Sequence, residues 1–278
     1  MLSRLFTFNP RHNEMRARYS VLADIDCDQF NVLCGKGRVV KKKIPLNGRE
    51  GQILVQDSTA EVVIVEGRNP GYLDWEVDEA WAGHVELHAP SYLYINLIEK
   101  RDSSKIFLCP TGLSCAHRVT LTTEALTYVR QRANGGPVRS DVVWTDPGLD
   151  RYGTHIIAAG DAPVSLKVDV DDVAVQAKGS QVEISGRSRL AGLRIIGKTL
   201  SDEFLWDTRT LVAEQMLVTL PRKGEIWVRA SKVLTVYRPS AKYTGKIGYS
   251  GDGDPKIVYR GRTKNVPPGT VYKIPNPN

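Results

Sequence analysis

Two short segments place histidine beside residues that can bind a metal or act in catalysis. His84 and His88 in the sequence HVELH are four residues apart, a spacing that on a helix would present two zinc ligands on one face. The segment instead alternates apolar and polar residues, which predicts a strand with His84, Glu86 and His88 on its solvated face. Cys115 and His117 could pair a thiolate with an imidazole, but no third residue is placed to orient the base. Neither segment predicts a metal site or a catalytic site.

Three aspartates close together in the chain, Asp169, Asp171 and Asp172, are the other candidate site for binding or catalysis. Together they could bind a cation or polarise a sugar. Glycoside cleavage needs two carboxyl groups about 5–9 Å apart, and residues two apart on a strand are separated by about 6.5 Å. Almost any acidic strand meets that condition, and no aromatic platform flanks the pair Asp169 and Asp171. A solvated strand face is therefore the preferred interpretation, and a carbohydrate-active β-solenoid enzyme is kept as a third hypothesis.

Sequence motifs that hold a cofactor or a metal ion are missing. The segment that begins at Gly35 starts like a dinucleotide-binding loop, but it lacks the third glycine and runs into Lys41–Lys43 instead of a helix. We interpret it as a turn. A calcium loop counted from Asp252 would place Lys256 at the third ligand position and Thr263 at the last, and neither residue could complete a calcium cage there. The sequence therefore predicts a protein that is not an enzyme, with no catalytic, cofactor-binding or metal-binding residues and no cofactor.

The cysteines and the N-terminus indicate the cellular compartment in which the protein is made. Cys27, Cys34, Cys109 and Cys115 have neither a CxxC spacing nor the density of a disulfide framework, so reduced and partly buried thiols are expected. The first twenty residues are basic but contain no apolar run long enough for a signal peptide. No run of eighteen apolar residues predicts a membrane span. These patterns indicate synthesis in the cytoplasm.

Short alternating segments separated by Gly, Pro, Asn and Asp predict a mainly β fold. The predicted N-terminal β-rich domain, 1–137, contains one helix over 122–133, where Leu121, Ala125 and Val129 recur every four residues. Weak periodicity over 138–162 predicts a linker. The ranges expected to form strands in the first hundred residues are 19–25, 32–40, 52–55, 60–65, 84–88 and 93–98.

The second predicted domain, 163–262, is nearly all strand. Val164, Leu166, Val168 and Val170 alternate without interruption, as expected of a half-buried strand. Further along, apolar centres recur about every ten residues, a spacing typical of a sandwich, a barrel or a β-solenoid. These centres are Val218, Val228, Val236, Ile247 and Ile257.

Short motifs in this second domain resemble the GIN-type adhesin-head family. The run 216–221 contains VTLP, a strand over 225–231 follows, and GYSGDGD at 248–254 precedes a strand that ends in Gly261. The resemblance implies a right-handed β-solenoid over 163–262 and carries no catalytic residues; a β-sandwich remains the alternative. Members of the family are usually exported, whereas the N-terminus of this sequence predicts no export.

Charge is concentrated at the C-terminal end of the chain. The whole chain holds 38 Lys and Arg against 31 Asp and Glu, a net charge of +7, and residues 209–278 alone hold 13 against 4, a net charge of +9. The predicted tail 263–278 is rich in proline and should be extended and docked. The predicted interface residues are Arg4, Arg11, Arg16, Arg229, Lys232, Arg238, Lys242, Lys246, Arg260, Arg262, Lys264 and Tyr272.

These features together predict a structural or assembly protein. The first hypothesis is a bacteriophage virion component, such as a decoration, collar, tail or baseplate protein, that is made in the host cytoplasm. Its partners would be other protein subunits, in a homo-oligomer or a multi-copy assembly, with no membrane span. The alternative is a cytoplasmic protein that binds nucleic acid or another anionic polymer through its basic region.

Overall fold

The structure is a computed structural model of the 278-residue chain. It describes residues 6–9, 14–17, 27, 31–46, 52–90, 95–132, 135–145, 154–158, 162–177, 182–195, 205–251, 253–261 and 266–277. Within these ranges the chain forms 21 β-strands and no helix. The mainly β prediction is therefore confirmed.

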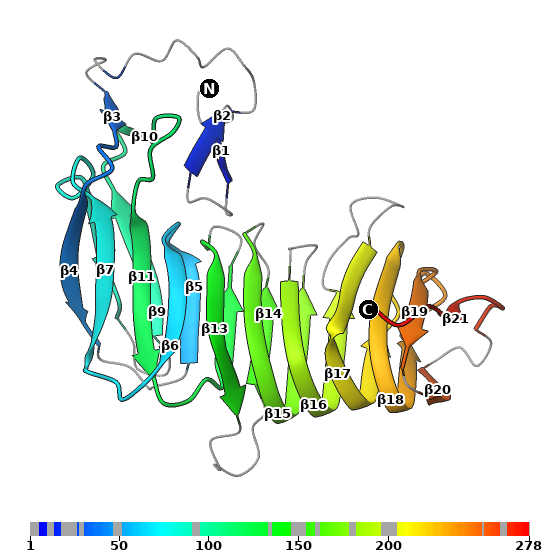
Figure 1. The fold of residues 1–278 in the computed structure, drawn as a ribbon. Helices are drawn as coiled ribbons and strands as arrows, with labels where there is room; N and C mark the ends of the chain where they lie inside the picture. The colour runs from blue at the N-terminus through cyan, green and yellow to red at the C-terminus, as the bar shows by residue number, and fades with distance from the viewer. Residues whose placement is uncertain are drawn as a thin grey trace.

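Most strands belong to one sheet, which folds into two facing ladders (Figure 1). Ladder 1 begins, in spatial order, with β4 (Val39–Pro45), β7 (Tyr72–Asp78), β11 (His117–Thr123), β6 (Glu61–Glu66) and β13 (Val138–Thr145). It continues with the first parts of four long strands, β15 (Val164–Ala177), β16 (Val182–Ile195), β17 (Leu205–Thr219) and β18 (Glu225–Arg238). It ends with β19 (Lys246–Ser250) and β21 (Val271–Lys273). Ladder 2 contains β8 (Val85–His88), β9 (Ile95–Arg101), β5 (Gln52–Asp57), β12 (Tyr128–Gln131), β14 (Thr154–Ala158), the second parts of β15 to β18, and β20 (Lys256–Gly261). Pairing is parallel except at the β4 and β8 end, where β4–β7, β7–β11 and β8–β9 are antiparallel.

Parallel pairing between successive turns of the chain makes this part of the molecule a β-solenoid. Val164 pairs with Val182, so one full turn of the coil separates residues that lie 18 positions apart. The ten-residue spacing seen in the sequence corresponds to half a turn, because Val228 lies in ladder 1 and Val218 and Val236 lie in ladder 2. The solenoid is therefore favoured over an antiparallel sandwich, and its right-handed coiling stays a prediction.

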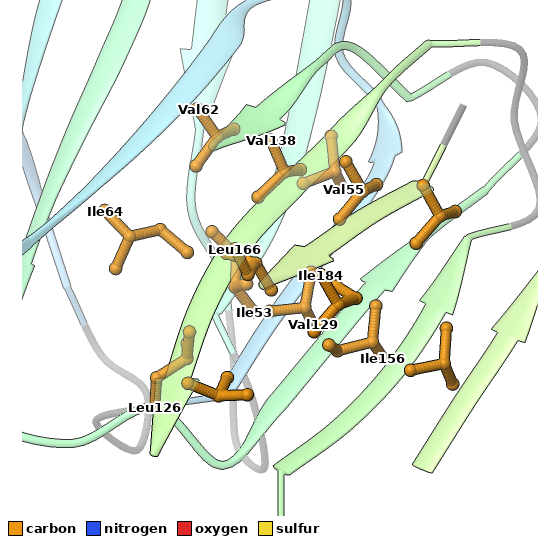
Figure 2. Packing of buried hydrophobic residues seen from close by; sticks show 14 of the residues in the cluster. Ile53, Val55, Val62, Ile64, Leu126, Val129, Val138, Ile156, Leu166 and Ile184 are labelled. Atoms are coloured by element: carbon orange, nitrogen blue, oxygen red, sulfur yellow. The ribbon is translucent and has the colours of Figure 1, made fainter. Parts of the chain in front are cut away.

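The hydrophobic core lies between the two ladders (Figure 2). Ile53 and Val129 point inward from ladder 2, and Val62, Leu166 and Ile184 point inward from ladder 1. Each of these side chains is almost fully buried. Because alternate residues of the central strands enter this core, a register shift of one residue would expose a whole apolar row.

The ladders continue through the range that was predicted to be a linker. Residues 138–162 include β13 and β14. β13 pairs with β6 on one side and β15 on the other, and β14 joins β12 to β15. Strand pairing is thus continuous from the N-terminal half to the C-terminal half, and the division at residue 163 stays a prediction.

The predicted helix over 122–133 is wrong. β11 ends at Thr123 and β12 begins at Tyr128. Leu121 and Val129 are both buried, but they enter the core from ladder 1 and ladder 2 respectively. Their helical spacing arises because the short connection between them crosses from one ladder to the other. Thr123 stabilises this crossing by donating its hydroxyl to the carbonyl of Ala125 at 2.8 Å.

The expectation of reduced thiols is also wrong. Cys27 and Cys34 form one disulfide, and Cys109 and Cys115 form a second. The first includes the last residue of β3 (Val32–Cys34), which pairs with β10 (Ile106–Leu108) in a small parallel sheet. Spacings of six and seven residues are short enough to be closed by a turn, which residue counting alone did not reveal. A separate hairpin is formed by β1 (Phe6–Asn9) and β2 (Glu14–Ala17).

The C-terminal tail adds a strand to the end of ladder 1. β21 pairs in parallel with β19, and the amide of Ile274 then donates to the carbonyl of Tyr249 at 2.8 Å. Ile274 is buried. The described part of the tail is therefore docked on the chain's own solenoid.

Candidate binding groove

A groove of about 730 Å³ lies on the outer face of ladder 1, in the N-terminal half of the molecule. This volume is within the range of small-ligand sites. Its floor is formed by outward-facing side chains of β7, β11, β6, β13 and β15, because the inward-facing residues of the same strands fill the core. The rim carries apolar residues, among them Val39, Ala116 and Pro163.

Charges alternate in sign from strand to strand over the floor and the neighbouring edge strand β4. Lys41 of β4 lies opposite Glu76 of β7, which lies opposite Arg118 of β11, and Arg118 lies opposite Glu61 of β6. Arg139 of β13 follows on the next strand. Lys41 and Arg118 thus stand two strands apart, about 9.5 Å at the usual strand spacing. Arg139 lies two strands beyond Arg118 and two residues further along, because it pairs with Val63 and not with Glu61.

Glu61 stands between the two arginines of the groove. Arg118 Nε donates to one carboxylate oxygen at 2.8 Å, and Arg139 Nε donates to the other at 2.7 Å. Partial burial alone would raise the pKa of Glu61, but the hydrogen bonds from Arg139 and Arg118 outweigh it and lower that pKa. Each arginine uses Nε for this bond, so the planar ends of both guanidinium groups are oriented by a fixed anion. We call Arg118, Glu61 and Arg139 the arginine clamp.

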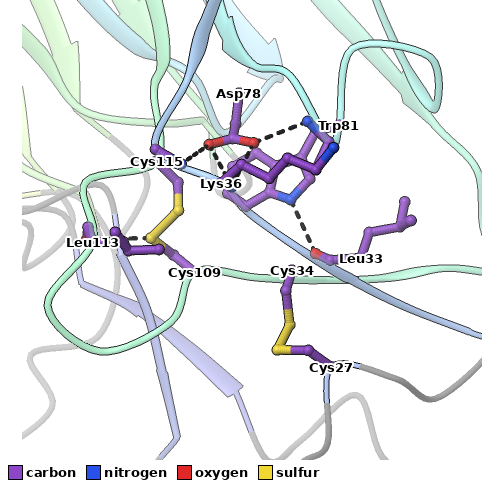
Figure 3. The surroundings of a disulfide bond; sticks show 11 residues. Cys27, Leu33, Cys34, Lys36, Asp78, Trp81, Cys109, Leu113 and Cys115 are labelled. Atoms are coloured by element: carbon purple, nitrogen blue, oxygen red, sulfur yellow. Dashed lines mark hydrogen bonds between the residues drawn. A yellow bond between two sulfur atoms is a disulfide. The ribbon is translucent and has the colours of Figure 1, made fainter.

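One wall of the groove is made by the loop that the Cys109–Cys115 disulfide closes (Figure 3). Ser114, Cys115 and Ala116 line the groove directly. Cys115 is buried, so the disulfide attaches the wall to the interior. The loop is therefore held in place by a covalent bond as well as by packing.

A second anchor holds the opposite side of this wall. Asp78 is fully buried, and its carboxylate accepts the amide of Lys36 at 3.0 Å and that of Gly37 at 2.8 Å. Gly35 has to be glycine, because an added Cβ would lie 2.3 Å from the sulfur of Cys115. The segment from Gly35 to Gly37 therefore bends around a carboxylate of the chain itself, which agrees with its interpretation as a turn and leaves no room for a dinucleotide phosphate.

A buried ionic cluster lies beneath the floor, at the start of β11. Glu99 accepts a hydrogen bond from the amide of Thr59 at 2.8 Å and lies 3.0 Å from Nε2 of His117. Arg101 donates to both Glu99 and Thr59. Burial alone would raise the pKa of Glu99, but its electrostatic interactions and hydrogen bonds with His117 and Arg101 hold that pKa well below its usual range. The imidazole of His117 therefore contacts the carboxylate of Glu99, and Cys115 is held in a disulfide with Cys109.

The other residues considered for chemistry lie on the surface. Val85 and Leu87 are buried while Glu86 and His88 are exposed, which confirms the predicted strand over Val85–His88. His84 instead lies in the turn before β8, 3.4 Å from Asp102. Asp169 and Asp171 are exposed on β15, and Asp171 lies 3.9 Å from Arg189. Among the described residues, no three His, Cys, Asp or Glu side chains gather as metal ligands would. Nor does this part of the chain contain a helix long and apolar enough to cross a membrane.

The structure does not bring the predicted interface residues together. Arg238 is buried and donates to the carbonyls of Ala241 and Tyr243, so its role is structural. Lys232 pairs with Glu214 at 2.8 Å. The other described members lie on different outer faces: Arg229, Lys246 and Tyr272 on ladder 1, Arg260 on ladder 2, and Lys242 in the turn after β18. Arg4, Arg11, Arg262 and Lys264 lie outside the described residues, and Arg16 is described only as a backbone position of β2.

Sequence reasoning missed the residues of the groove. Arg118 lies 57 residues from Glu61, and Arg139 lies 78 residues from it. The alternation of apolar and polar residues indicates that each points outward. It carries no information about which strands are neighbours.

Comparison with known proteins supports the fold. No protein-family model matches the sequence, and no curated protein is similar to it in sequence. A "putative adhesin" from Bacteroides fragilis has a TM-score of 0.59 at 14% identity and covers 87% of this chain and 99% of its own. A "putative lipid binding protein" from Parabacteroides distasonis has a TM-score of 0.53 at 15% identity and covers 88% of this chain and 100% of its own. A second "putative adhesin", also from Parabacteroides distasonis, has a TM-score of 0.50 at 15% identity and covers 87% of this chain and 100% of its own.

At these identities the likeness is one of fold alone. The shared adhesin-like fold extends over nearly nine tenths of the chain. The resemblance found in the sequence covered only 163–262. The N-terminal half, which had no motif to identify it, therefore belongs to the same architecture.

Proposed function

We propose that the protein is a non-enzymatic, adhesin-like binding protein that holds its partner in the groove of ladder 1. The observation that carries this proposal is the arginine clamp, in which two guanidinium groups are held by one carboxylate on the floor of a groove. Fixed guanidinium groups bind carboxylates and sulfates through charge-assisted hydrogen bonds. Two of the three structural neighbours described above carry the name adhesin, which agrees with a binding role.

The partner we propose is an acidic polysaccharide. Arg118 and Arg139 stand two strands apart on the floor, and Lys41 stands beside it on β4, so a linear polymer with spaced anionic groups could contact more than one of them. Arg118 and Arg139 are each about two fifths exposed, and the hydroxyl-bearing Ser114 and Ser165 line the same groove. Two disulfides are in keeping with folding in an oxidising compartment, where such polymers occur on cell surfaces.

Binding to a defined polymer tests the proposal. The intact protein should bind immobilised polygalacturonate, which carries a carboxylate on every sugar, and should not bind neutral dextran. Arg118→Gln and Arg139→Gln should each weaken this binding by roughly tenfold, because a hydrogen bond to a charged group contributes about 1.5–3 kcal/mol. Surface plasmon resonance at several salt concentrations would measure the effect.

The matched control is Arg187→Gln, which removes an exposed arginine of β16 that does not line the groove. It should leave the affinity within a factor of two of the wild type. Equal binding to dextran, or an equal loss in all three variants, would contradict a site at the arginine clamp.

Assembly into a bacteriophage virion is a second proposal, which rests on the basic C-terminal part of the chain. Lys242, Lys246 and Arg260 are exposed there and could contact an acidic neighbouring subunit. Their separation over different faces favours several small contacts over one nucleic-acid track. Portal and tail genes next to the coding sequence would support this proposal.

A further inference from the structure

The outer face of ladder 2 between β15 and β20 is formed by alternate residues of β15 to β18 and β20. Its outward positions form three rows that run across the strands. The first row is Asp172, Leu190, Gln215, Val233 and Lys256; the second is Ala174, Gly192, Leu217, Thr235 and Val258; and the third is Gln176, Arg194, Thr219, Tyr237 and Arg260. We call these positions the C-terminal outer face.

Charge is almost absent from the middle of this face. The second row carries no charged residue, and Leu190, Leu217 and Tyr237 are 37%, 42% and 40% exposed. The ladder 1 face of the same turns is densely charged, with Lys167, Asp169, Glu183, Arg187, Asp207, Arg209, Glu225, Arg229 and Lys246. Exposed apolar side chains with charges only at the margin are the pattern of a protein interface.

The arrangement of these residues is complementary to itself. A twofold axis that runs along β17 exchanges β15 with β20 and β16 with β18. It would place Asp172 of one copy against Lys256 of the other, and Leu190 against Val233. It would also place Leu217 against its own counterpart. Opposite charges therefore meet at the margin and apolar residues meet at the centre.

The third row agrees with the same axis. It would bring Arg194 against Tyr237, a cation over an aromatic ring, and would leave Arg260 facing the neutral Gln176. The alternative is a twofold axis that runs along the solenoid. It would place Lys256 of one copy against Arg260 of the other, which is unfavourable because both are cations. The charge pattern thus selects one symmetric arrangement, with antiparallel solenoids and aligned strands, as in face-to-face packing of two sheets.

We propose that two copies of this chain form a homodimer through the C-terminal outer face, related by a twofold axis along β17. The two ladder 1 faces, with their grooves, then point away from each other. A dimer of this kind presents two grooves and would bind a repeated ligand more tightly than one copy does. The dimer itself does not depend on what the groove binds.

Size-exclusion chromatography with light scattering tests the dimer. The wild-type protein should show a concentration-dependent mass that approaches about twice 30.9 kDa. Gly192→Glu should shift the protein to a monomer, because its side chain would enter the interface. An added Cβ at Gly192 meets nothing within 4 Å, so this substitution leaves the folded copy undisturbed. Gly83→Glu is the matched control, since Gly83 has equally open space but lies far from this face.

Charge reversal tests the symmetry. Asp172→Lys and Lys256→Asp should each weaken the dimer by at least about tenfold, because each homodimer then has two like-charged pairs. An equimolar mixture of the two variants should dimerise again, because both of its pairs are Lys with Asp. A monomeric wild type at all concentrations, or a mixture that does not recover, would overturn the proposal. Polysaccharide binding is measured separately, so its loss would not affect this result.

Discussion

The side chain of Glu99, beneath the groove, is buried and ionised. Its carboxylate contacts His117, Arg101 and the amide of Thr59, so each oxygen has a partner. A buried charge without such partners would cost several kcal/mol. The cluster ties β9 to β11 and to the turn before β6, and it therefore supports the strands that carry the arginine clamp.

Stability should fall in acid because of Glu99. The pKa of Glu99 is lowered in the folded protein from a usual value of 4.5. A lowered folded pKa stabilises the fold above the unfolded value, and this stabilisation is lost as the pH falls from about 4.5 towards the folded pKa. The free energy of unfolding in urea should therefore decrease steadily between pH 5 and pH 3.

Glu99→Gln should remove most of that pH dependence. It should also lower the free energy of unfolding at pH 7 by about 3 kcal/mol, because it leaves Arg101 without its carboxylate. Glu86→Gln, at a largely exposed position, serves as the control and should change neither quantity by more than about 0.5 kcal/mol. An unchanged acid slope in Glu99→Gln would show that other carboxyl groups cause the loss.

The two ends of ladder 1 are formed by different elements. Lys42 points inward from the edge strand β4, lies over the ring of Trp75 and donates to the carbonyl of Ala82 at 2.7 Å. An inward charge on an edge strand disfavours pairing with another chain. At the other end β21 and Ile274 cover β19. The two ends are thus closed by different means, and the flat outer faces stay accessible.

Loss of the Cys109–Cys115 disulfide should affect both stability and binding. Cys109→Ser with Cys115→Ser should lower the free energy of unfolding by about 2 kcal/mol, the chain-entropy value for so short a loop. It should also weaken polygalacturonate binding, because the loop is a wall of the groove.

Cys27→Ser with Cys34→Ser is the matched variant, because it opens a loop of similar length whose described residues do not line the groove. It should reduce stability without changing affinity. Equal affinity in both double variants would show that the wall does not contribute to binding.

Ile274 should account for much of the docking of the tail. Its side chain packs beside Gly248, where an added Cβ would lie 3.1 Å from Ile274 and 2.9 Å from Trp227. Ile274→Ala should lower the free energy of unfolding by about 2 kcal/mol, as expected when a large buried aliphatic side chain is truncated. It should also speed hydrogen exchange at the amide of residue 274. Protection that stays at the wild-type level would show that the strand pairing of β21 alone holds the tail.

At the scale of the whole molecule, the two outer faces differ in composition. Ladder 1 carries the groove and a dense array of charges, and ladder 2 carries the apolar C-terminal outer face. The same turns of the solenoid supply both faces, because each of β15 to β18 contributes to both ladders. A dimer through ladder 2 would therefore leave ladder 1 free to bind.

Much of the fold could be predicted from the sequence, because alternation of side chains is a local property. Val164, Leu166 and Val168 indicated their strand and its buried face, and the resemblance carried by the run 216–221, which contains VTLP, indicated the solenoid. Alternation also placed His88 on a solvated face. The same local reasoning failed at Leu121 and Val129, since a four-residue spacing is produced both by a helix and by a crossing between two ladders.

The tertiary structure alone decided which strands are neighbours. β5 and β6 are inserted between β9 and β12 and between β11 and β13, so the order in space differs from the order in the chain. That insertion brings Glu61 between Arg118 and Arg139 and creates the arginine clamp. The sequence by itself determined which side of each strand faces the core, because burial of apolar side chains follows a two-residue period. Partners far apart in the chain are selected by the packing of whole strands, and no local pattern records that choice.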